Sequence, residues 1–301
     1  MSMTRSTPQA LVELLATTSG TREEIWEGRN ILLINQEWGS LIVSLQGAQI
    51  LHFAPKGQAG WIWTTSTPKT APDAIRGGIP LCWPWFGDKE DGKGPAHGYA
   101  RISQWRLDAQ ENEYEGDNIE GVELHLSPVE KLDEQLAPRV LIQANRTRLR
   151  IELITEHVGE TPVRFTQALH SYFSVGNSHS CKVNGLAGTT YIDKLNEGRT
   201  FDQMGELAIR DALDRIYHSS RPLELVDPRS DETRHLRIAK EGSDSSVVWH
   251  PGAHPPSDIP EDELFHFLCV EAACTQLDPI WLAPGGQHVL VQHITLEHEQ
   301  D

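Results

Sequence analysis

Two side chains in the second half of the chain could act together as an acid and a base. Glu271 lies in the apolar run FHFLCVEAAC, where strand alternation puts it on the same face as Phe267 and Cys269. A carboxylate on such a face is costly unless it is paired or lies at an open edge of the sheet. Glu271 is therefore either half of a structural ion pair or a positioned acid or base. His170, in TQALHSYFSVGN, has two similar interpretations, structural or catalytic.

The stretch 75–101, IRGGIPLCWPWFGDKEDGKGPAHGYAR, combines glycine, proline and aromatic residues. Gly and Pro disfavour a long helix or a central strand, so we expect a shaped loop of the kind that lines small-molecule sites. Arg76 and Arg101 bracket it, and each presents a planar fork suited to carboxylate or phosphate. His97 lies among glycines, where backbone can approach a ligand. The simpler alternatives are surface ion pairs and a turn histidine.

Composition excludes several functions. The 301 residues carry a formal net charge of −17, with 38% hydrophobic and 23% charged residues, as in a soluble globular protein. An acidic surface disfavours partners such as nucleic acid or an anionic membrane, so a few local arginines must capture any anionic substrate. The four cysteines form no C-x-x-C pair, and neither a secretory signal nor a membrane-spanning apolar run is evident. We therefore expect reduced thiols and a cytoplasmic location.

Strand-like segments dominate the chain. A short helix is expected at 7–16, with Thr7 as its N-cap, and a hairpin turn at 145–148. The region 188–205 is expected to be loop-rich. Apolar and β-branched runs predict strands at 31–34, 40–45, 49–53, 61–65, 103–107, 122–126, 140–144, 149–157, 163–173, 181–185, 236–239, 246–249, 264–274 and 289–296. This pattern indicates an all-β antiparallel sandwich or barrel in one domain, 1–301, with about 1–29 as an N-terminal extension carrying the short helix.

Other chemistries lack support in the sequence. The phosphate-binding, dinucleotide-binding, H-E-x-x-H and G-x-S-x-G motifs are absent. His288 and His293 are an odd number of residues apart, which puts them on opposite faces of a strand, and no neighbours have metal-ligand spacing. The acidic stretch 88–94 misses the EF-hand spacing. No metal and no cofactor are expected.

Six blocks, in order, resemble the glucose-6-phosphate 1-epimerases (hexose-6-phosphate mutarotases) of the galactose-mutarotase-like superfamily. The resemblance covers the chain from about residue 30 to the end. The blocks are R-G-G-I-P-x-C-W-P-W-F-G at 76–87, H-G-Y-A-R at 97–101, L-H-S-Y-F-S-V-G at 169–176, Y-I-D-K-L at 191–195, D-R-I-Y at 214–217 and V-E-A-A around Glu271. The resemblance implies a large antiparallel β-supersandwich with few short helices and a sugar site on its concave face.

The resemblance also implies an activity. It is the interconversion of the α and β anomers of a D-hexose 6-phosphate, glucose 6-phosphate first, by an isomerase that needs neither cofactor nor metal. His170 matches the general acid toward the ring oxygen, and Glu271 matches the general base on the anomeric hydroxyl. At neutral pH this assignment requires an ionised carboxylate beside an imidazolium, which Glu271 should help to stabilise. A monomer is the default expectation.

Substrate-binding roles carry over to Arg76, Arg101 and Asp193, with the arginines on the phosphate, and His97 would line the pocket. One position departs from the family pattern: Ala96 stands where a polar residue such as Gln often precedes the H-G pair. A hydrogen bond from that side chain is lost or replaced, so affinity or sugar preference should differ.

Trp83 and Trp85 could offer indole faces to a pyranose or could pack within the loop.

Two alternatives to the sugar-phosphate epimerase remain open. One is an aldose 1-epimerase acting on unphosphorylated sugar, distinguished by comparing turnover on glucose and on glucose 6-phosphate. The other is a non-catalytic carbohydrate-binding protein, which would need no acid–base pair.

Overall fold

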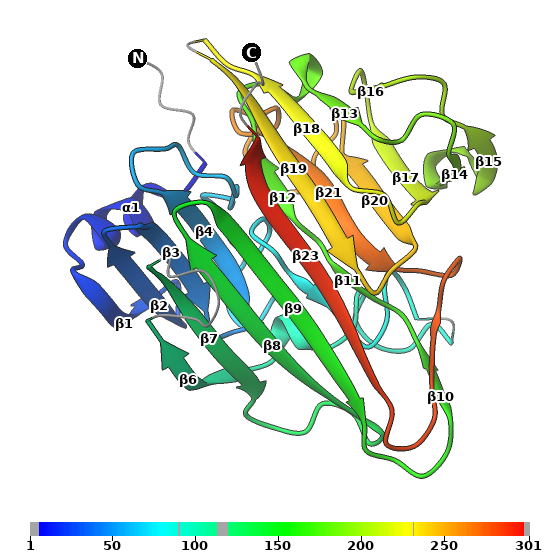
Figure 1. Ribbon diagram of the computed structural model, residues 1–301, viewed down its shortest axis with the longest axis horizontal. Helices are drawn as coiled ribbons and strands as arrows, with labels where there is room; N and C mark the ends of the chain where they lie inside the picture. Colours follow the sequence, from blue (N-terminus) through cyan, green and yellow to red (C-terminus); the bar gives the residue numbers. More distant parts are fainter. Residues whose placement is uncertain (1–5, 90, 113–119, 231, 298–301) are drawn as a thin grey trace.

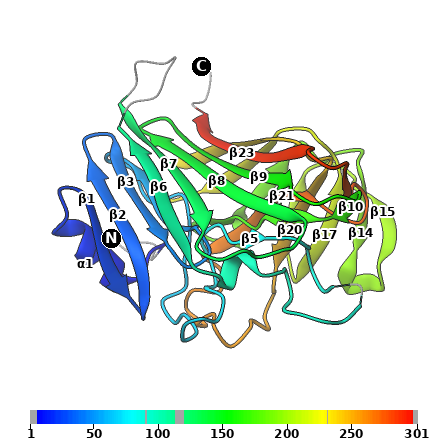
Figure 2. The ribbon, with the colours of Figure 1, turned by 90° about the horizontal axis from the view of Figure 1, so that it is seen from below.

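The computed structural model describes residues 6–89, 91–112, 120–230 and 232–297. Two large sheets make up most of it, and all pairs of named strands are antiparallel (Figures 1 and 2). One sheet has nine strands, in the order β16 (Leu207–Ala208), β13 (Lys182–Asn184), β18 (Leu223–Pro228), β19 (Thr233–Glu241), β23 (Gln287–Glu297), β9 (Arg148–His157), β8 (Leu136–Asn145), β7 (Gly121–Pro128) and β6 (Trp105–Glu111).

The second sheet carries the residues that the sequence singles out. Its order is β15 (Arg199–Asp202), β14 (Thr190–Asp193), β17 (Leu213–His218), β20 (Ser245–His250), β21 (Phe267–Cys274), β11 (Gln167–Leu169) and β5 (Leu81–Cys82), with β12 (Tyr172–Ser174) also paired to β21. The smaller sheets are β1 (Gly20–Trp26), β2 (Arg29–Gln36), β3 (Gly39–Ser44) and β4 (Gln49–Pro55), and β10 (Val163–Phe165) with β22 (Ile280–Leu282). The predicted all-β antiparallel architecture is confirmed.

The main core lies between the two large sheets. In β9, alternate residues such as Ile151 and Leu153 are buried, and their neighbours are half-exposed, as expected for a sheet with one solvated face. Every residue of β21 is buried, because both of its faces are covered. Leu268 and Val270 point into the main core, while Phe267 points to the opposite face. The second face of β21 therefore lies under other segments of the chain.

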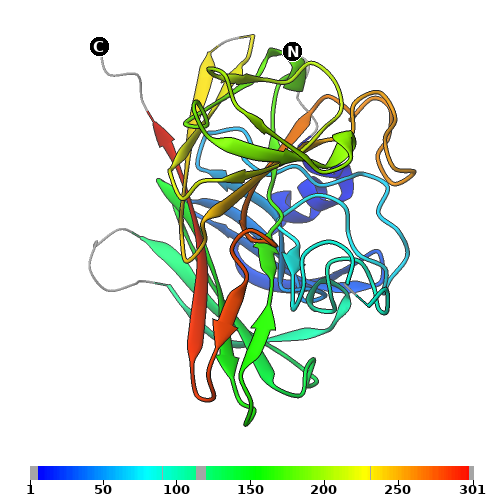
Figure 3. The same cartoon turned by 90° about the vertical axis from the view of Figure 1, so that its right-hand side faces the viewer.

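Two loop segments lie on that second face. They are the Gly- and Pro-rich stretch 75–101, which contains only β5 and the 3₁₀ turn η1 (Ala100–Ile102), and the loop at 251–266 (Figure 3). Ile259 and Leu264 of the second loop pack on Tyr172 and Phe267. The prediction that 75–101 is a shaped loop is confirmed.

The N-terminal part forms a separate apolar cluster against the four-stranded sheet. Helix α1 (Gln9–Ala16) buries Leu11 and Leu15 there. Thr7 does not cap it: its hydroxyl hydrogen-bonds to Nδ1 of the buried His52 at 2.8 Å, and Pro8 occupies the N-cap position. Strand β1 lies within the segment expected to be an extension. Among the described residues, no helix is long and apolar enough to cross a bilayer.

Three local predictions are corrected and one is confirmed. The strand expected at 163–173 is three short strands: β10 pairs with β22, whereas β11 and β12 pair with two separate stretches of β21 on either side of a break at His170. The segment 61–65 makes only isolated bridges, and the loop-rich region 188–205 contains the β14–β15 hairpin with the 3₁₀ turn η3 (Lys194–Asn196). The turn at 145–148 is present: Asn145 Oδ1 accepts hydrogen bonds from the amides of Thr147 and Arg148.

Candidate active site

Cross-strand register places the site on the loop-covered face of the eight-stranded sheet. Directly paired residues share a face, and one row across β14, β17, β20 and β21 runs Ile192, Ile216, Val247 and Glu271. The adjacent row runs Asp214, Trp249, Cys269 and Tyr172, from β17 to β12. Glu271 therefore lies at the centre of a mixed apolar and polar surface, away from the main core.

His170 meets Glu271 at the break between β11 and β12. Its amide donates to the carbonyl of Pro80 at 3.0 Å, and its Nε2 lies 3.4 Å from Glu271 Oε1. The ring stacks on Tyr172, with centroids 4.9 Å apart and planes 10° apart. The side chains of His170 and Glu271 are 11% and 1% exposed. The structure thus brings the predicted acid–base pair together in a nearly closed position.

The pair has unused hydrogen-bonding capacity. His170 Nδ1 and both Glu271 carboxylate oxygens are buried and make no hydrogen bond within the described part of the chain. Most buried polar atoms in proteins have a partner, and each exception calls for an explanation. The hydroxyl groups of a bound sugar would supply donors and acceptors at these atoms.

Burial sets the charge state of the pair. It lowers the pKa of His170 well below its usual value, and the nearby His97, Arg76 and Arg101 act in the same direction. Burial also raises the pKa of Glu271 well above its usual value, with a further increase from Asp214 and an opposing effect of Lys194. The protein thus favours a neutral imidazole beside a protonated carboxyl. The expected ion pair is not favoured here because neither charge is solvated.

His97 lies against His170, with ring centroids 5.6 Å apart. Its backbone is left-handed, with φ of 63°, and its Nδ1 accepts a hydrogen bond from the Gly87 amide at 3.2 Å. Burial, followed by Arg101, Lys194 and Arg76, lowers its pKa to about 3. The neutral ring therefore carries its proton on Nε2. Next to it, Gly98 is required, because a Cβ there would lie 2.0 Å from a backbone oxygen.

The two arginines at the ends of the loop have different surroundings. Arg76 Nε lies 3.2 Å from Asp258 Oδ1, and its Nη1 donates to Tyr172 Oη at 3.1 Å. Arg101 Nη2 donates to the Ala96 carbonyl at 2.7 Å, and its buried Nε makes no hydrogen bond among the described residues. Position 96 thus contributes through its backbone, which any residue would supply.

The acid of the Y-I-D-K-L block, to which the resemblance assigns substrate binding, lies on a different face of the sheet from Glu271. Asp193 accepts from the Leu195 amide at 3.1 Å and lies 3.9 Å from Arg215 Nε, on the alternate face to Glu271. Asp214, from the D-R-I-Y block, lies on the face of Glu271 and is 3.5 Å from Lys194 Nζ. Sequence reasoning missed Asp214 and Lys194. Alternation puts Asp214 and Ile216 on one face, but only strand pairing shows that it is the site face.

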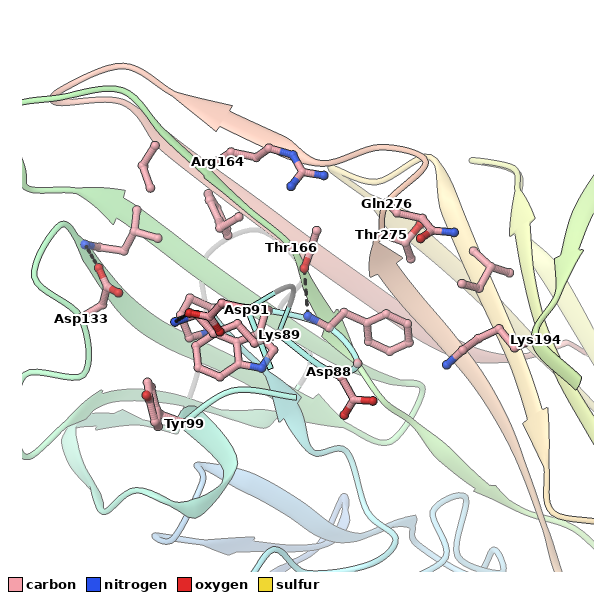
Figure 4. Close-up of a pocket in the computed structure, with 18 of the residues that line it drawn as sticks. Asp88, Lys89, Asp91, Tyr99, Asp133, Arg164, Thr166, Lys194, Thr275 and Gln276 are labelled. Carbon is pink, nitrogen blue, oxygen red and sulfur yellow. Dashed lines mark hydrogen bonds and ion pairs between the residues drawn. The ribbon is translucent and has the colours of Figure 1, made fainter. Parts of the chain in front are cut away.

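The two tryptophans of the loop also differ. Trp83 is completely buried in the main core, and its Nε1 donates to Thr155 of β9 at 3.0 Å. It cannot line the pocket, because its polar atom is bonded on the core side. Trp85 lines a pocket of about 870 Å³, together with Phe86, Tyr99 and other residues (Figure 4). This pocket is not lined by His170 or Glu271, so the contact of Trp85 with a sugar at the acid–base pair stays a prediction.

One group of side chains within the described ranges could hold a metal ion. Ligand atoms of Glu111, Glu123 and His125 all lie within 4.8 Å of one another. The group spans β6 and β7, in the other large sheet from the catalytic pair. A metal there would have no direct contact with His170 or Glu271.

Comparison with known proteins places this geometry in a family. The aldose 1-epimerase profile matches residues 29–295. Curated relatives named "Putative glucose-6-phosphate 1-epimerase" occur in Salmonella typhimurium (33% identity, covering 76% of this chain and 77% of the relative) and in Escherichia coli (31% identity, 76% and 78%). Another, from Cenchrus ciliaris, is 28% identical and covers 93% of this chain and 86% of the relative.

Solved structures agree on the fold. A "putative mutarotase" from Salmonella typhimurium superimposes with a TM-score of 0.85 at 25% identity, covering 97% of this chain and all of that chain. A galactose mutarotase-like protein from Clostridium acetobutylicum has a TM-score of 0.69 at 13% identity, covering 92% and 98%. The matched residues include the shaped loop, the β11–β12 break and β21. The chain therefore belongs to the aldose 1-epimerase family.

Proposed function

We propose that the protein interconverts the α and β anomers of a hexose 6-phosphate, with glucose 6-phosphate as its first candidate substrate. The observation that carries this proposal is the buried His170–Glu271 contact of 3.4 Å, with polar atoms on both side chains that lack partners in the described chain. Arg76 and Arg101 act electrostatically on His170, so an anionic group bound to them would lie near the reacting atoms. The names of the curated relatives point to the same substrate.

The reaction needs one base and one acid at the same time. The base accepts the proton of the anomeric hydroxyl while the acid protonates the ring oxygen, and the bond between the ring oxygen and the anomeric carbon breaks. Rotation of the resulting aldehyde exposes its other face, and ring closure returns both protons with the roles reversed. Each positioned proton transfer contributes about 10²–10⁴-fold. His170 and Glu271 share one acidic proton between them. The residue that carries this proton can act as the acid and the other residue as the base.

Substrate binding would adjust the position of that proton. Arg76 and Arg101 lower the pKa of His170 in the free protein, after the larger effect of burial. A phosphate dianion bound to the two guanidinium groups offsets their positive charge and so raises the pKa of His170. The proton then moves from Glu271 to His170, which produces the carboxylate base and imidazolium acid of the expected mechanism. Asp214 and Lys194, on the same face, are placed to bind ring hydroxyls.

An unphosphorylated aldose is the second candidate substrate. One observation favours it: Arg76 already binds Asp258 and Tyr172, which leaves less of its guanidinium for a phosphate. In that case Arg76 would position Tyr172 under His170, and ring hydroxyls would contact Arg101. A non-catalytic carbohydrate-binding protein is disfavoured, because binding alone gives no reason to bury an acid–base pair.

The test is anomer exchange followed by polarimetry or NMR saturation transfer on glucose 6-phosphate and glucose, with native protein and Glu271→Gln. We expect exchange of glucose 6-phosphate by the native protein and its loss in the variant, while circular dichroism shows an unchanged fold. Native-like exchange in folded Glu271→Gln would refute the mechanism. Faster native exchange of glucose than of its 6-phosphate would favour the second candidate.

A further inference from the structure

The pocket beside Trp85 shares Lys194 with the residues assigned to the proposed reaction and extends away from the others. Its volume of about 870 Å³ is near the upper end of the range found for small-molecule sites, roughly 300–1,000 Å³. Neither His170 nor Glu271 lines it. Phe86 separates it from the catalytic pair: this ring lines the pocket, packs against Val247 and Ala273 beside Glu271, and contacts the His97 ring, with centroids 5.2 Å apart.

The pocket and Arg76 lie on opposite sides of Glu271. Along β21, Cys269 precedes Glu271 and pairs with Tyr172, which bonds Arg76. Beyond the other end of β21, Thr275 and Gln276 line the pocket. Across the sheet, Ile216 also lines it, two strand spacings or roughly 10 Å from Glu271. A ligand that spans Arg76 and the pocket must therefore cross the catalytic pair.

The chemistry of the pocket fits a neutral polyol. Aromatic rings of Trp85, Phe86, Tyr99 and Phe165 line it, and polar side chains lie among them. Its lining charges balance, with Lys89, Arg164 and Lys194 against Asp88, Asp91 and Asp133. Figure 4 shows Lys194, Thr275 and Gln276 at one end and Tyr99 and Asp133 at the other. Apolar rings combined with a few placed polar groups and no net charge suit a sugar ring better than an anion.

We propose that this pocket is a second sugar subsite, which binds the pyranose attached to the 2- or 3-hydroxyl of a reducing-end hexose at the catalytic pair. The inference rests on the proposed function for its orientation. In a pyranose held by its anomeric carbon and ring oxygen, the 6-position projects beside the ring oxygen and the 2-position beside the anomeric carbon. When the 6-position faces Arg76, the 2- and 3-positions face the pocket.

The test compares glucose disaccharides that differ only in linkage. We expect kcat/KM for anomer exchange of kojibiose or nigerose, linked through the 2- and 3-hydroxyls, to exceed that of glucose about tenfold. Isomaltose, linked through the 6-hydroxyl, should exchange no better than glucose, because its second ring meets Arg76. Isothermal titration with the same sugars measures binding independently of turnover.

Two variants test the pocket itself. Trp85→Leu and Gln276→Ala should each reduce the preference for kojibiose or nigerose over glucose at least threefold. Trp85 Nε1 also bonds the Pro95 carbonyl, so Gln276→Ala, at an exposed position, serves where Trp85→Leu disturbs the loop. The matched control is Phe201→Leu, an exposed aromatic residue on β15 outside the pocket, which should leave the preference unchanged.

The outcomes separate the two proposals. Exchange of glucose 6-phosphate without any kojibiose or nigerose preference in turnover or binding would overturn the subsite and leave the proposed function intact. Absence of exchange on every sugar would refute the proposed function. If exchange is absent, the binding data still test the subsite. Tight binding of isomaltose alone, or equal binding of all three disaccharides, would overturn the subsite as well.

Discussion

Asp227 and Glu271 are both carboxylates buried in this fold, and they differ in how their oxygens are used. Asp227 Oδ1 accepts from the Gly176 amide at 2.8 Å and is 3.7 Å from Cys181 Sγ. Its Oδ2 accepts from Arg229 Nε at 2.7 Å and Arg234 Nη2 at 3.2 Å. Every lone-pair direction of this side chain is served by the protein, which is what a structural buried charge requires.

Glu271 has none of these donors. Its contact within the described structure is His170 at 3.4 Å, which does not meet hydrogen-bond geometry, and burial raises its pKa. The difference teaches that burial alone does not distinguish a structural charge from a functional one. What distinguishes them is whether the protein satisfies the buried group, because an unsatisfied group is unstable by itself and available to a substrate.

The sharpest test of this comparison is activity. Glu271→Gln should reduce anomer exchange about 10²–10⁴-fold, because it removes one positioned proton transfer. Asp227→Asn should leave the exchange rate per folded molecule within about threefold, since Asp227 takes no part in the reaction. Polarimetry on both purified variants, normalised to the folded fraction, measures the contrast. Equal losses of activity in the two variants would show that Asp227 and Glu271 do not differ in function.

Stability should respond in the opposite way. Asp227→Ala should lower the free energy of unfolding by about 3–5 kcal/mol, because Arg234 is left buried without its counter-ion. Urea unfolding followed by tryptophan fluorescence measures this loss. The control is Asp108→Ala, which breaks an exposed ion pair with Arg106 and should cost under about 1 kcal/mol. A loss of that small size for Asp227→Ala would contradict the structural assignment.

Removal of Arg76 or Arg101 should have a smaller effect on activity, and one that is specific to the phosphorylated sugar. Arg76→Ala and Arg101→Ala should each raise KM for glucose 6-phosphate about 10–100-fold, since a charge-assisted hydrogen bond contributes roughly 1.5–3 kcal/mol. KM for glucose should change much less. Arg139→Ala, an exposed arginine on β8, is the matched control. Parallel increases for both sugars would show that the arginines act on the sugar ring or the fold and not on a phosphate.

The pH dependence of stability should show the smallest of these effects, and it reports the protonation state of Glu271 most directly. The pKa of Glu271 is raised in the folded protein, so the folded state binds more protons than the unfolded one above pH 4.5. Native stability is therefore lost as pH rises from 4.5 toward the raised folded pKa. Glu271→Gln removes this loss, so its stability relative to the native protein should increase from pH 5 to pH 8. A constant difference in urea unfolding would indicate an ordinary carboxyl pKa.

Local signals predicted much of this molecule from the sequence. The hairpin turn at Asn145, the short helix and most strands follow from side-chain type and alternation. Strand alternation singled out Glu271 on an apolar face, and the resemblance paired it with His170 as base and acid. The resemblance assigned substrate binding to Asp193, and Asp214 was not considered, because alternation cannot say which face of a strand meets a given neighbour. Trp83 and Trp85 are separated by one residue, yet they point to the core and the pocket respectively.

By itself, the sequence determined the strand-rich character of the protein, the shaped loop and the unusual placement of His170 and Glu271. These depend on interactions within a few residues, which short patterns record. Only the tertiary structure decided that β20 and β17 extend the sheet beside the strand of Glu271, that Asp214 and Lys194 share the face of Glu271, and that His170 and Glu271 lie between Arg76 and a large pocket. The physical reason is that register and burial arise from contacts between distant segments, and those contacts set both the desolvation of the pair and its protonation.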